Sequence, residues 1–271
     1  MNELNEKKLE TYSYSKVKMF YSCKQAFYTR YFEKPTELLN HGTSEFGSFM
    51  HEILEKYEKG ELEIYEMLPY YIEHYNDVVK SSFVLNINAN FSKDFSDNYY
   101  IDGIKYLENF EGFPQFNILE VEHEFEVNIE DKFLFNGKID LIARNNDGEL
   151  IILDHKSKSK FKNKKELNEY AKQLYLYAYA VKQEYGELPK KLYFNMFRTN
   201  ELVEIDFDIN DYQNAYNWLV SSVNEIENTF DFSPQEDEDP FYCLNFCPVK
   251  NQCEYINNWQ GWINWRIYMK K

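Results

Sequence analysis

Two short apolar strands that end in charged residues constrain the fold of this chain most. Residues 137–142 read Gly-Lys-Ile-Asp-Leu-Ile, and residues 151–156 read Ile-Ile-Leu-Asp-His-Lys. The Asn-Asn-Asp-Gly segment at 145–148 favours a tight turn and so predicts a β-hairpin. This hairpin would bring the carboxylates of Asp140 and Asp154 together with the Lys156 ammonium at one edge of a sheet.

Such a trio suits a divalent cation beside a positive group. Two carboxylates within a few ångströms repel each other unless a cation lies between them, and oxygen ligands favour Mg²⁺ or Mn²⁺. A bound metal would lower the pKa of a water and take up charge on a phosphate, while Lys156 orients the nucleophile or stabilises developing charge. We interpret Lys156 as lying on the opposite strand face from Asp154, so we expect a twist or bulge to turn it inward. The alternative is that Asp and Lys only terminate solvated strand ends.

The surrounding pattern predicts a mixed α/β fold, because strands, a helix and further strands follow one another. Residues 76–103 are rich in Asn, Ser and Asp, and we expect only short helices and loops there. In the strand at 118–129, alternation places Glu122 and Glu124 on a solvated face, so we leave both out of the metal site. The other expected helices cover 13–75, 165–185 and 211–230, and the other expected strands cover 132–143, 149–156, 192–198 and 202–207.

The charge balance bears on nucleic-acid binding. The formal net charge of −16 opposes a general attraction to phosphates. Residues 156–165, however, hold six lysines and no acid. A basic path on an acidic body can guide a strand to one place, and we assign its nucleic-acid contacts to Lys158, Lys160, Lys162 and Lys164. The alternative is a solvated loop.

The cysteines indicate a metal or cluster site. The chain has four, of which Cys243, Cys247 and Cys253 lie close together and Cys23 lies far upstream. Their number and spacing do not suggest a disulfide framework. The sequence has no long apolar stretch and no apolar N-terminal segment, and together with the cysteine usage this predicts a cytoplasmic protein.

The motifs together resemble the PD-(D/E)XK nuclease superfamily, specifically its RecB-like branch. They follow the order of that branch and span about residues 13–255: Ser13-Tyr14-Ser15, Gly47 to His51, Asp140, Asp154-His155-Lys156, and Gln173 to Tyr177. The resemblance implies a restriction-endonuclease-like mixed sheet core flanked by helices. It divides one integrated domain into an N-terminal helical region (1–112), a nuclease core (113–208) and a C-terminal helix with a cysteine-bearing tail (209–271). From its composition, we expect the segment at 233–240 to link that last helix to the cysteine-bearing tail.

The resemblance also implies roles for the site residues. His51, which by position alone would be a packing residue on an amphipathic helix ending near Gly60, becomes a metal ligand with Asp140, Asp154 and His155. An imidazole suits manganese better than magnesium. The catalytic set is then Asp140, Asp154, Lys156, Gln173 and Tyr177. Gln173 and Tyr177 are one helical turn apart, and we expect them to contact the substrate or the lysine; packing is the alternative.

The cysteine distribution resembles the iron–sulfur subset of this branch, which includes AddB-type nuclease subunits and CRISPR-associated RecB-like exonucleases. The resemblance implies a [4Fe-4S] cluster on Cys23, Cys243, Cys247 and Cys253; the alternatives are a zinc site and unligated core cysteines. The tail has three residues between its first two cysteines where the family pattern has two. The expected role is structural, clamping the N-terminal region to the tail.

The expected function is a metal-dependent DNA exonuclease acting on single-stranded or end-containing DNA. Recombination, repair, phage replication and CRISPR spacer acquisition are all compatible processes. The alternative is a silent nucleic-acid-binding or assembly subunit of a helicase or integrase complex. The sequence contains no Gly-x-x-x-x-Gly-Lys-Ser/Thr motif, so unwinding would come from a helicase partner, and recombinase or integrase partners fit the same processes.

Overall fold

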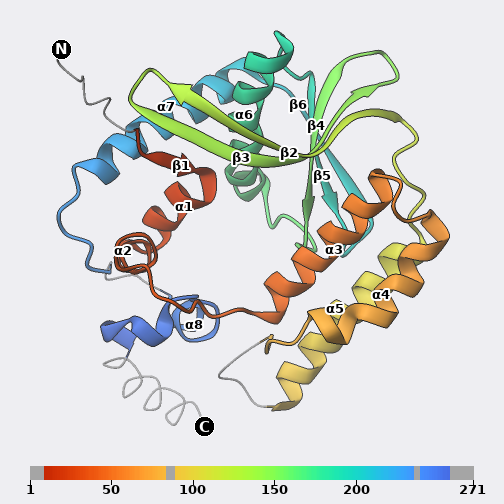
Figure 1. Ribbon diagram of the computed structural model, residues 1–271, viewed down its shortest axis with the longest axis horizontal. Helices are drawn as coiled ribbons and strands as arrows, with labels where there is room; N and C mark the ends of the chain where they lie inside the picture. The colour runs from red at the N-terminus through yellow and green to blue at the C-terminus, as the bar shows by residue number, and fades with distance from the viewer. Residues whose placement is uncertain (1–8, 84–88, 235–238, 257–271) are drawn as a thin grey trace, which may run out of the picture.

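A six-stranded mixed sheet forms the centre of the protein in the computed structural model, which describes residues 9–83, 89–234 and 239–256 (Figure 1). The long strand β3 (Phe133–Asn145) pairs antiparallel with β2 (Phe116–Ile129) along almost its whole length. It also pairs with β1 (Thr11–Ser13), in parallel, and with β4 (Leu150–Lys156), antiparallel. The sheet continues through β5 (Lys191–Met196) to β6 (Glu201–Asp206).

Helices cover both faces of this sheet. α6 (Lys164–Tyr185) follows Asn163, whose side chain accepts the Glu166 N–H, and is capped at its end by Gly186, where φ of +74° suits glycine. The remaining helical elements are α1 (Tyr14–Ser22), α2 (Lys24–Tyr28), the π-helix η1 (Thr29–Glu33), α3 (Gly42–Glu58), α4 (Ile64–Val78), α5 (Ala89–Glu108), α7 (Ile209–Glu227), α8 (Pro240–Asn245) and the 3₁₀-helix η2 (Lys250–Gln252).

Two hydrophobic clusters hold these layers together. One contains residues of α1, α6 and α7, and the other contains residues of α3, α4 and α5. On β4, Ile152 belongs to the first cluster, whereas Ile151 and Leu153 belong to the second, as strand alternation requires. β4 is therefore buried on both faces, and its carboxyl end is held rigidly.

The predicted fold class is confirmed, with three differences in detail. Residues 89–108 form the 20-residue helix α5 in place of short helices and loops, because aromatic residues such as Tyr99 and Tyr106 pack into the second cluster. Residues 11–13, expected to be at the edge of a helical region, form β1. The alternation of β2 is broken at Glu122, where φ is +53°. Part of the expected linker, residues 235–238, lies outside the described residues.

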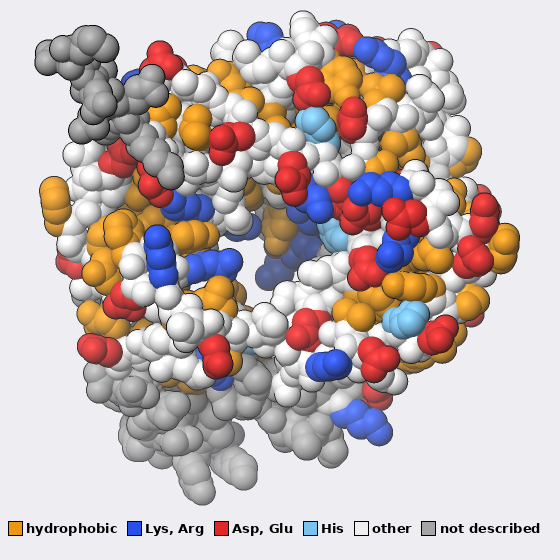
Figure 2. Space-filling model, in the orientation of Figure 1, with side chains coloured by type: hydrophobic (Ala, Val, Ile, Leu, Met, Phe, Trp, Pro, Cys, Tyr) orange, Lys and Arg blue, Asp and Glu red, His pale blue; other side chains and the backbone are white. Residues whose placement is uncertain are grey.

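The N-terminal helices and α3 lie on opposite sides of the view in Figure 1, with the sheet between and above them. Figure 2 shows this face hollowed at its centre, with Lys and Arg side chains gathered around the hollow. No helix among the described residues has the length and apolar character that a membrane crossing needs.

Candidate active site

Asp140 and Asp154 lie buried on neighbouring strands, with 8% and 4% of their surfaces exposed. The Asp140 Oδ2 accepts a 2.6 Å hydrogen bond from the His155 backbone N–H, which ties β3 to β4. The Lys156 Nζ lies 2.6 Å from the Asp154 Oδ2. The expectation of a bulge before Lys156 is wrong: β4 pairs with β5 in unbroken register, and residues two apart on a strand share a face.

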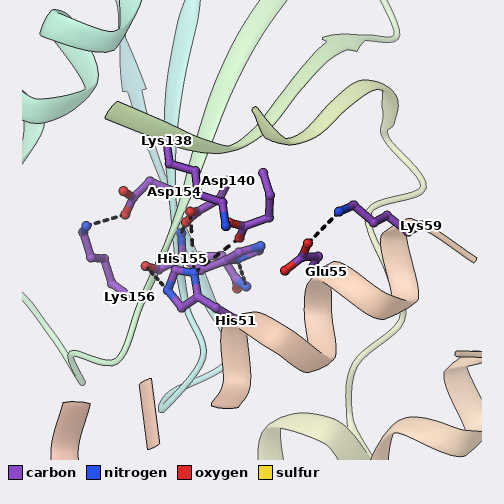
Figure 3. Close-up of polar contacts among 10 residues, drawn as sticks. His51, Glu55, Lys59, Lys138, Asp140, Asp154, His155 and Lys156 are labelled. Atoms are coloured by element: carbon purple, nitrogen blue, oxygen red, sulfur yellow. Dashed lines mark hydrogen bonds and ion pairs between the residues drawn. The ribbon is translucent and has the colours of Figure 1, made fainter. Parts of the chain in front are cut away.

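His51 reaches this pair of acids from α3 (Figure 3). Its Nδ1 lies 3.5 Å from the Asp140 Oδ1 and 3.8 Å from the Glu122 Oε1. Its Nε2 lies 3.1 Å from the His155 backbone oxygen. The predicted helix therefore brings His51 to the hairpin from which it is separated by about ninety residues in sequence, and it lies among oxygen atoms that prefer a cation.

Glu122 belongs to this group, so the prediction that it lies on a solvated strand face is wrong. Its side chain is only 8% exposed, and it also pairs with Lys138. The register pairs Val121 with Leu141 and His123 with Ile139, so Glu122 lies opposite Asp140. The positive φ at Glu122 breaks the simple alternation. The sequence does show an acidic residue in the strand before the hairpin. Simple alternation, however, predicts that the Glu122 side chain faces solvent and not the site.

The His155 ring is held in place by Asn195 and Phe113. Its Nδ1 lies 2.8 Å from the Asn195 Nδ2, and the ring stacks on Phe113. Burial lowers the pKa of His155 to about 4, against the opposing charge of Asp140, so the ring is neutral. The His155 backbone oxygen lies near the His51 Nε2, and the two imidazole rings pack edge-to-face with their centroids 5.4 Å apart. Asn195, which holds the ring, is a residue that the sequence analysis missed.

Lys156 is positioned by a chain of hydrogen bonds. Its Nζ donates to the Gln173 Oε1 at 3.1 Å, and the Gln173 Nε2 donates to the Tyr177 hydroxyl at 2.6 Å. The Tyr177 ring packs against Phe125. A Cβ at Gly137 would lie 2.9 Å from the Tyr177 ring and 2.7 Å from that of Phe125. Gly137 therefore leaves the room that Tyr177 needs beneath the site.

Opposing electrostatic effects set the protonation of the site. Burial by itself would raise the pKa of Asp140, but the charge and hydrogen bond of His51 outweigh it and lower that pKa. Burial would lower the pKa of His51, yet Asp140 and Glu122 raise it to about 10. Burial raises the pKa of Asp154 to about 6, with Lys156 opposing and Asp140 adding to the shift. Without a metal, a protonated His51 balances the charge of Asp140, while Lys156 pairs with Asp154 and Lys138 with Glu122.

These donors fit a divalent metal. One ligand atom from each of His51, Glu122 and Asp140 lies within 4.8 Å of the others. The buried Asp154 Oδ2 has an ion pair with Lys156 at 2.6 Å, which supplies the positive charge that a buried carboxylate needs. The case for a metal therefore rests on the grouping of His51, Glu122 and Asp140. The set of carboxylates and one imidazole suits Mg²⁺ or Mn²⁺.

The lysine-rich segment after β4 is partly tied down. Lys158 lies 3.0 Å from Glu166, and the backbone N–H of Lys162 donates to the same carboxylate. Lys160, Lys162 and Lys164 have exposed side chains. The segment is therefore an ordered loop that leads into α6, with three of its four assigned lysines facing solvent.

The four cysteines meet at one place. Cys23, Cys243, Cys247 and Cys253 all line one small pocket. The nearby thiols contribute to raising the pKa of Tyr242, after burial. The segment before α3 is bonded to this region, because the Leu39 N–H donates to the Pro248 oxygen at 2.8 Å. Residues separated by more than two hundred positions thus form one sulfur-lined site next to the chain that leads to His51.

Comparisons with known proteins agree with this architecture. No curated protein sequence matches the chain. A crystal structure described as a proposed exonuclease from Eubacterium rectale has a TM-score of 0.52 and 14% identity, covering 95% of this chain and 92% of that chain. The crystal structure of SSO0001 has a TM-score of 0.37 and 16% identity, over 77% of this chain and 95% of that one.

A family-model match covers nearly the whole chain, including every residue of the candidate site. The model of the PD-(D/E)XK nuclease superfamily matches residues 11–254, a span that runs from β1 to beyond the last cysteine. Within it lie the buried acids, the lysine and the histidine whose geometry is described above. The chain belongs to the PD-(D/E)XK nuclease superfamily.

Proposed function

We propose that this nuclease is a metal-dependent DNA exonuclease of the RecB-like, iron–sulfur type. The observation that carries the proposal is the convergence of His51, Asp140, Asp154 and Lys156 at one end of β4, with Glu122 beside them. A set of hard ligands next to an ammonium group suits hydrolysis of a phosphodiester.

The residues divide the chemical work between them. His51, Glu122, Asp140 and Asp154, with the His155 backbone oxygen, would hold the metal, which supplies Lewis-acid charge and lowers the pKa of a water. The Lys156 ammonium, 2.6 Å from Asp154, lies where it can orient a water or stabilise charge on a phosphoryl oxygen.

Gln173 and Tyr177, both on α6, position Lys156 through hydrogen bonds. The Gln173 oxygen accepts from the ammonium, and Tyr177 fixes the amide of Gln173. One N–H of the Lys156 ammonium donates to Gln173, and the ammonium also contacts Asp154. Lys156 is therefore held in place before the substrate binds.

The hollow beside the site favours an exonuclease over an endonuclease. β1 is fixed to β3, and His51 is fixed at Asp140, so the continuous chain from β1 through α3 borders the hollow (Figures 1 and 2). A DNA strand lying in the hollow would be encircled and would enter by a free end. The Lys and Arg side chains around the hollow (Figure 2) supply positive charge to a chain that is acidic as a whole.

The test compares linear with circular DNA. End-labelled single- and double-stranded linear DNA and circular single-stranded DNA are incubated with Mn²⁺, Mg²⁺ or EDTA, with Asp154→Asn as the inactive control. We expect metal-dependent degradation of linear single strands and resistance of the circle. Rapid cleavage of the circle would overturn the exonuclease assignment, and absence of metal-dependent cleavage would favour a silent nucleic-acid-binding subunit.

The iron–sulfur assignment rests on the shared sulfur-lined pocket. Four thiols from the α1–α2 junction and the tail around one pocket suit a [4Fe-4S] cluster, which would cross-link two distant parts of the chain. Protein purified without oxygen should be brown and hold iron and sulfide, and Cys23→Ser should bleach it and expose the tail to protease. Colourless protein with stoichiometric zinc would overturn the cluster, and a fully coloured Cys23→Ser variant would overturn the role of Cys23.

A further inference from the structure

Lys18, from a distant part of the chain, lies near Lys158, one of the predicted DNA-binding lysines. Lys18, on α1, places its Nζ 4.6 Å from the centre of the Tyr170 ring on α6. The Lys158 Nζ lies 5.6 Å from the centre of the same ring. Two ammonium groups from segments about 140 residues apart in sequence therefore share one aromatic platform.

This platform is continuous with the catalytic lysine. The Phe161 ring lies 5.3 Å from that of Tyr170 and 5.3 Å from that of Phe194. The Lys156 Nζ lies 5.8 Å from the centre of the Phe194 ring. A row of three aromatic rings thus supports the ammonium groups of Lys156, Lys158 and Lys18, and it leads from the active site toward α1.

Lys18 differs from Lys156 and Lys158 in the ion pairs that it makes. Lys156 pairs with Asp154 and Lys158 pairs with Glu166, whereas Lys18 has no carboxylate within 4.0 Å among the described residues. Burial lowers its pKa, as do the charges of Lys156 and Lys158, with Glu169 opposing. Like charges held together at a partly desolvated place are unfavourable unless an anion joins them.

The fold holds Lys18 in this position without closing it off. The Tyr14 hydroxyl, one turn before Lys18, donates to the Glu169 backbone oxygen at 2.8 Å and fixes α1 to α6. The Lys18 side chain remains exposed to solvent. It lies on the helix that borders the hollow on the side opposite α3 (Figures 1 and 2). A ligand in the hollow can therefore reach Lys18.

We propose that Lys18 and Lys158 form a phosphate-binding site over Tyr170, which holds a backbone phosphate of the DNA strand outside the metal site. The inference rests on the proposed function, since it takes that strand as the ligand. The phosphodiester would supply the negative charge that Lys18 lacks, and the ammonium would bind it without regard to base sequence. The strand would then run between the acids and α1.

The test measures binding separately from cleavage. Fluorescence anisotropy follows a labelled oligo(dT) strand at several salt concentrations, with Ca²⁺ in place of the catalytic metal. The variants are Lys18→Gln, Lys18→Arg and, as a matched loss of one charge, Lys132→Gln in the β2–β3 turn, where Lys132 pairs with Glu130. Cleavage of the same strand with Mn²⁺ gives kcat and KM.

The site predicts a specific pattern among these variants. Lys18→Gln should weaken binding about tenfold and reduce the slope of log affinity against log salt by about 0.7, as loss of one phosphate contact on a single strand requires. KM should rise with kcat unchanged, because this contact is equally present in ground and transition states. Lys18→Arg should keep most of the affinity, and Lys132→Gln should match the wild type.

Other outcomes distinguish failure of the phosphate site from failure of the proposed nuclease function. A Lys18→Gln variant with wild-type affinity and salt slope would overturn the phosphate site and leave the nuclease intact. An equal loss in Lys132→Gln would show a general charge effect and would also overturn the site. A wild-type protein that fails to bind oligo(dT) would overturn both this inference and the proposed function.

Discussion

Metal binding should displace protons from the ligands of the site, and the number released should depend on pH. The charges of Asp140 and Glu122 raise the pKa of His51 to about 10 against the effect of burial, and burial raises that of Asp154 to about 6. Between these values the metal-free protein carries a proton on His51 but not on Asp154. A metal ligand must be a neutral imidazole or an ionised carboxylate, so binding must displace that proton.

The size of the effect follows from the two pKa values. Between about pH 7 and pH 9, one proton leaves per metal ion, so the apparent Mn²⁺ affinity should rise about tenfold per pH unit, equivalent to about 1.4 kcal/mol. Below about pH 6, Asp154 is also protonated in the metal-free state, and the dependence should approach about a hundredfold per unit. The sign is the same in both ranges: a higher pH strengthens metal binding.

Isothermal titration calorimetry measures this directly. Titrations of Mn²⁺ at pH 8 in two buffers of different ionisation enthalpy give the number of protons released. The wild type should release one, and His51→Asn should bind more weakly and release none. A wild-type protein that releases no proton at pH 8 would refute the reasoning, because His51 would then be either neutral beforehand or still protonated beside the metal.

Three substitutions probe other parts of the site. Asp154→Asn should abolish metal-dependent cleavage, with Tm unchanged or higher at neutral pH, because burial disfavours the charged form of this carboxyl; a lower Tm would contradict this. Glu122→Gln should weaken Mn²⁺ binding by about 10- to 100-fold in the same calorimetric assay, and unchanged affinity would exclude it as a ligand. Gly137→Ala should lower the free energy of unfolding by about 1–3 kcal/mol, measured by denaturant titration, because the new Cβ overlaps Phe125 and Tyr177. It should also lower kcat through Tyr177, and a variant with wild-type kcat would show that Tyr177 does not position Lys156.

The sequence alone determined the elements that carry the chemistry. Local pattern sufficed for the β3–β4 hairpin, because apolar strands and an Asn-Asp-Gly turn are short-range signals. The same holds for α3, α6 and α7, whose apolar positions recur with helical spacing. The order of motifs then indicated the superfamily, which the family match confirms. The roles assigned to the individual site residues stay predictions.

Only the tertiary structure decided which distant groups meet. Glu122 turns inward through a positive φ that alternation does not reveal, and Asn195 reaches His155 from a strand forty residues further along. α5 exists because its aromatic residues find partners in α3 and α4, although its polar composition suggests loops. Lys18 gains its place beside Lys158 only when α1 packs on α6. In each case the stabilising contact joins segments far apart in sequence, and its energy depends on packing that no local pattern encodes.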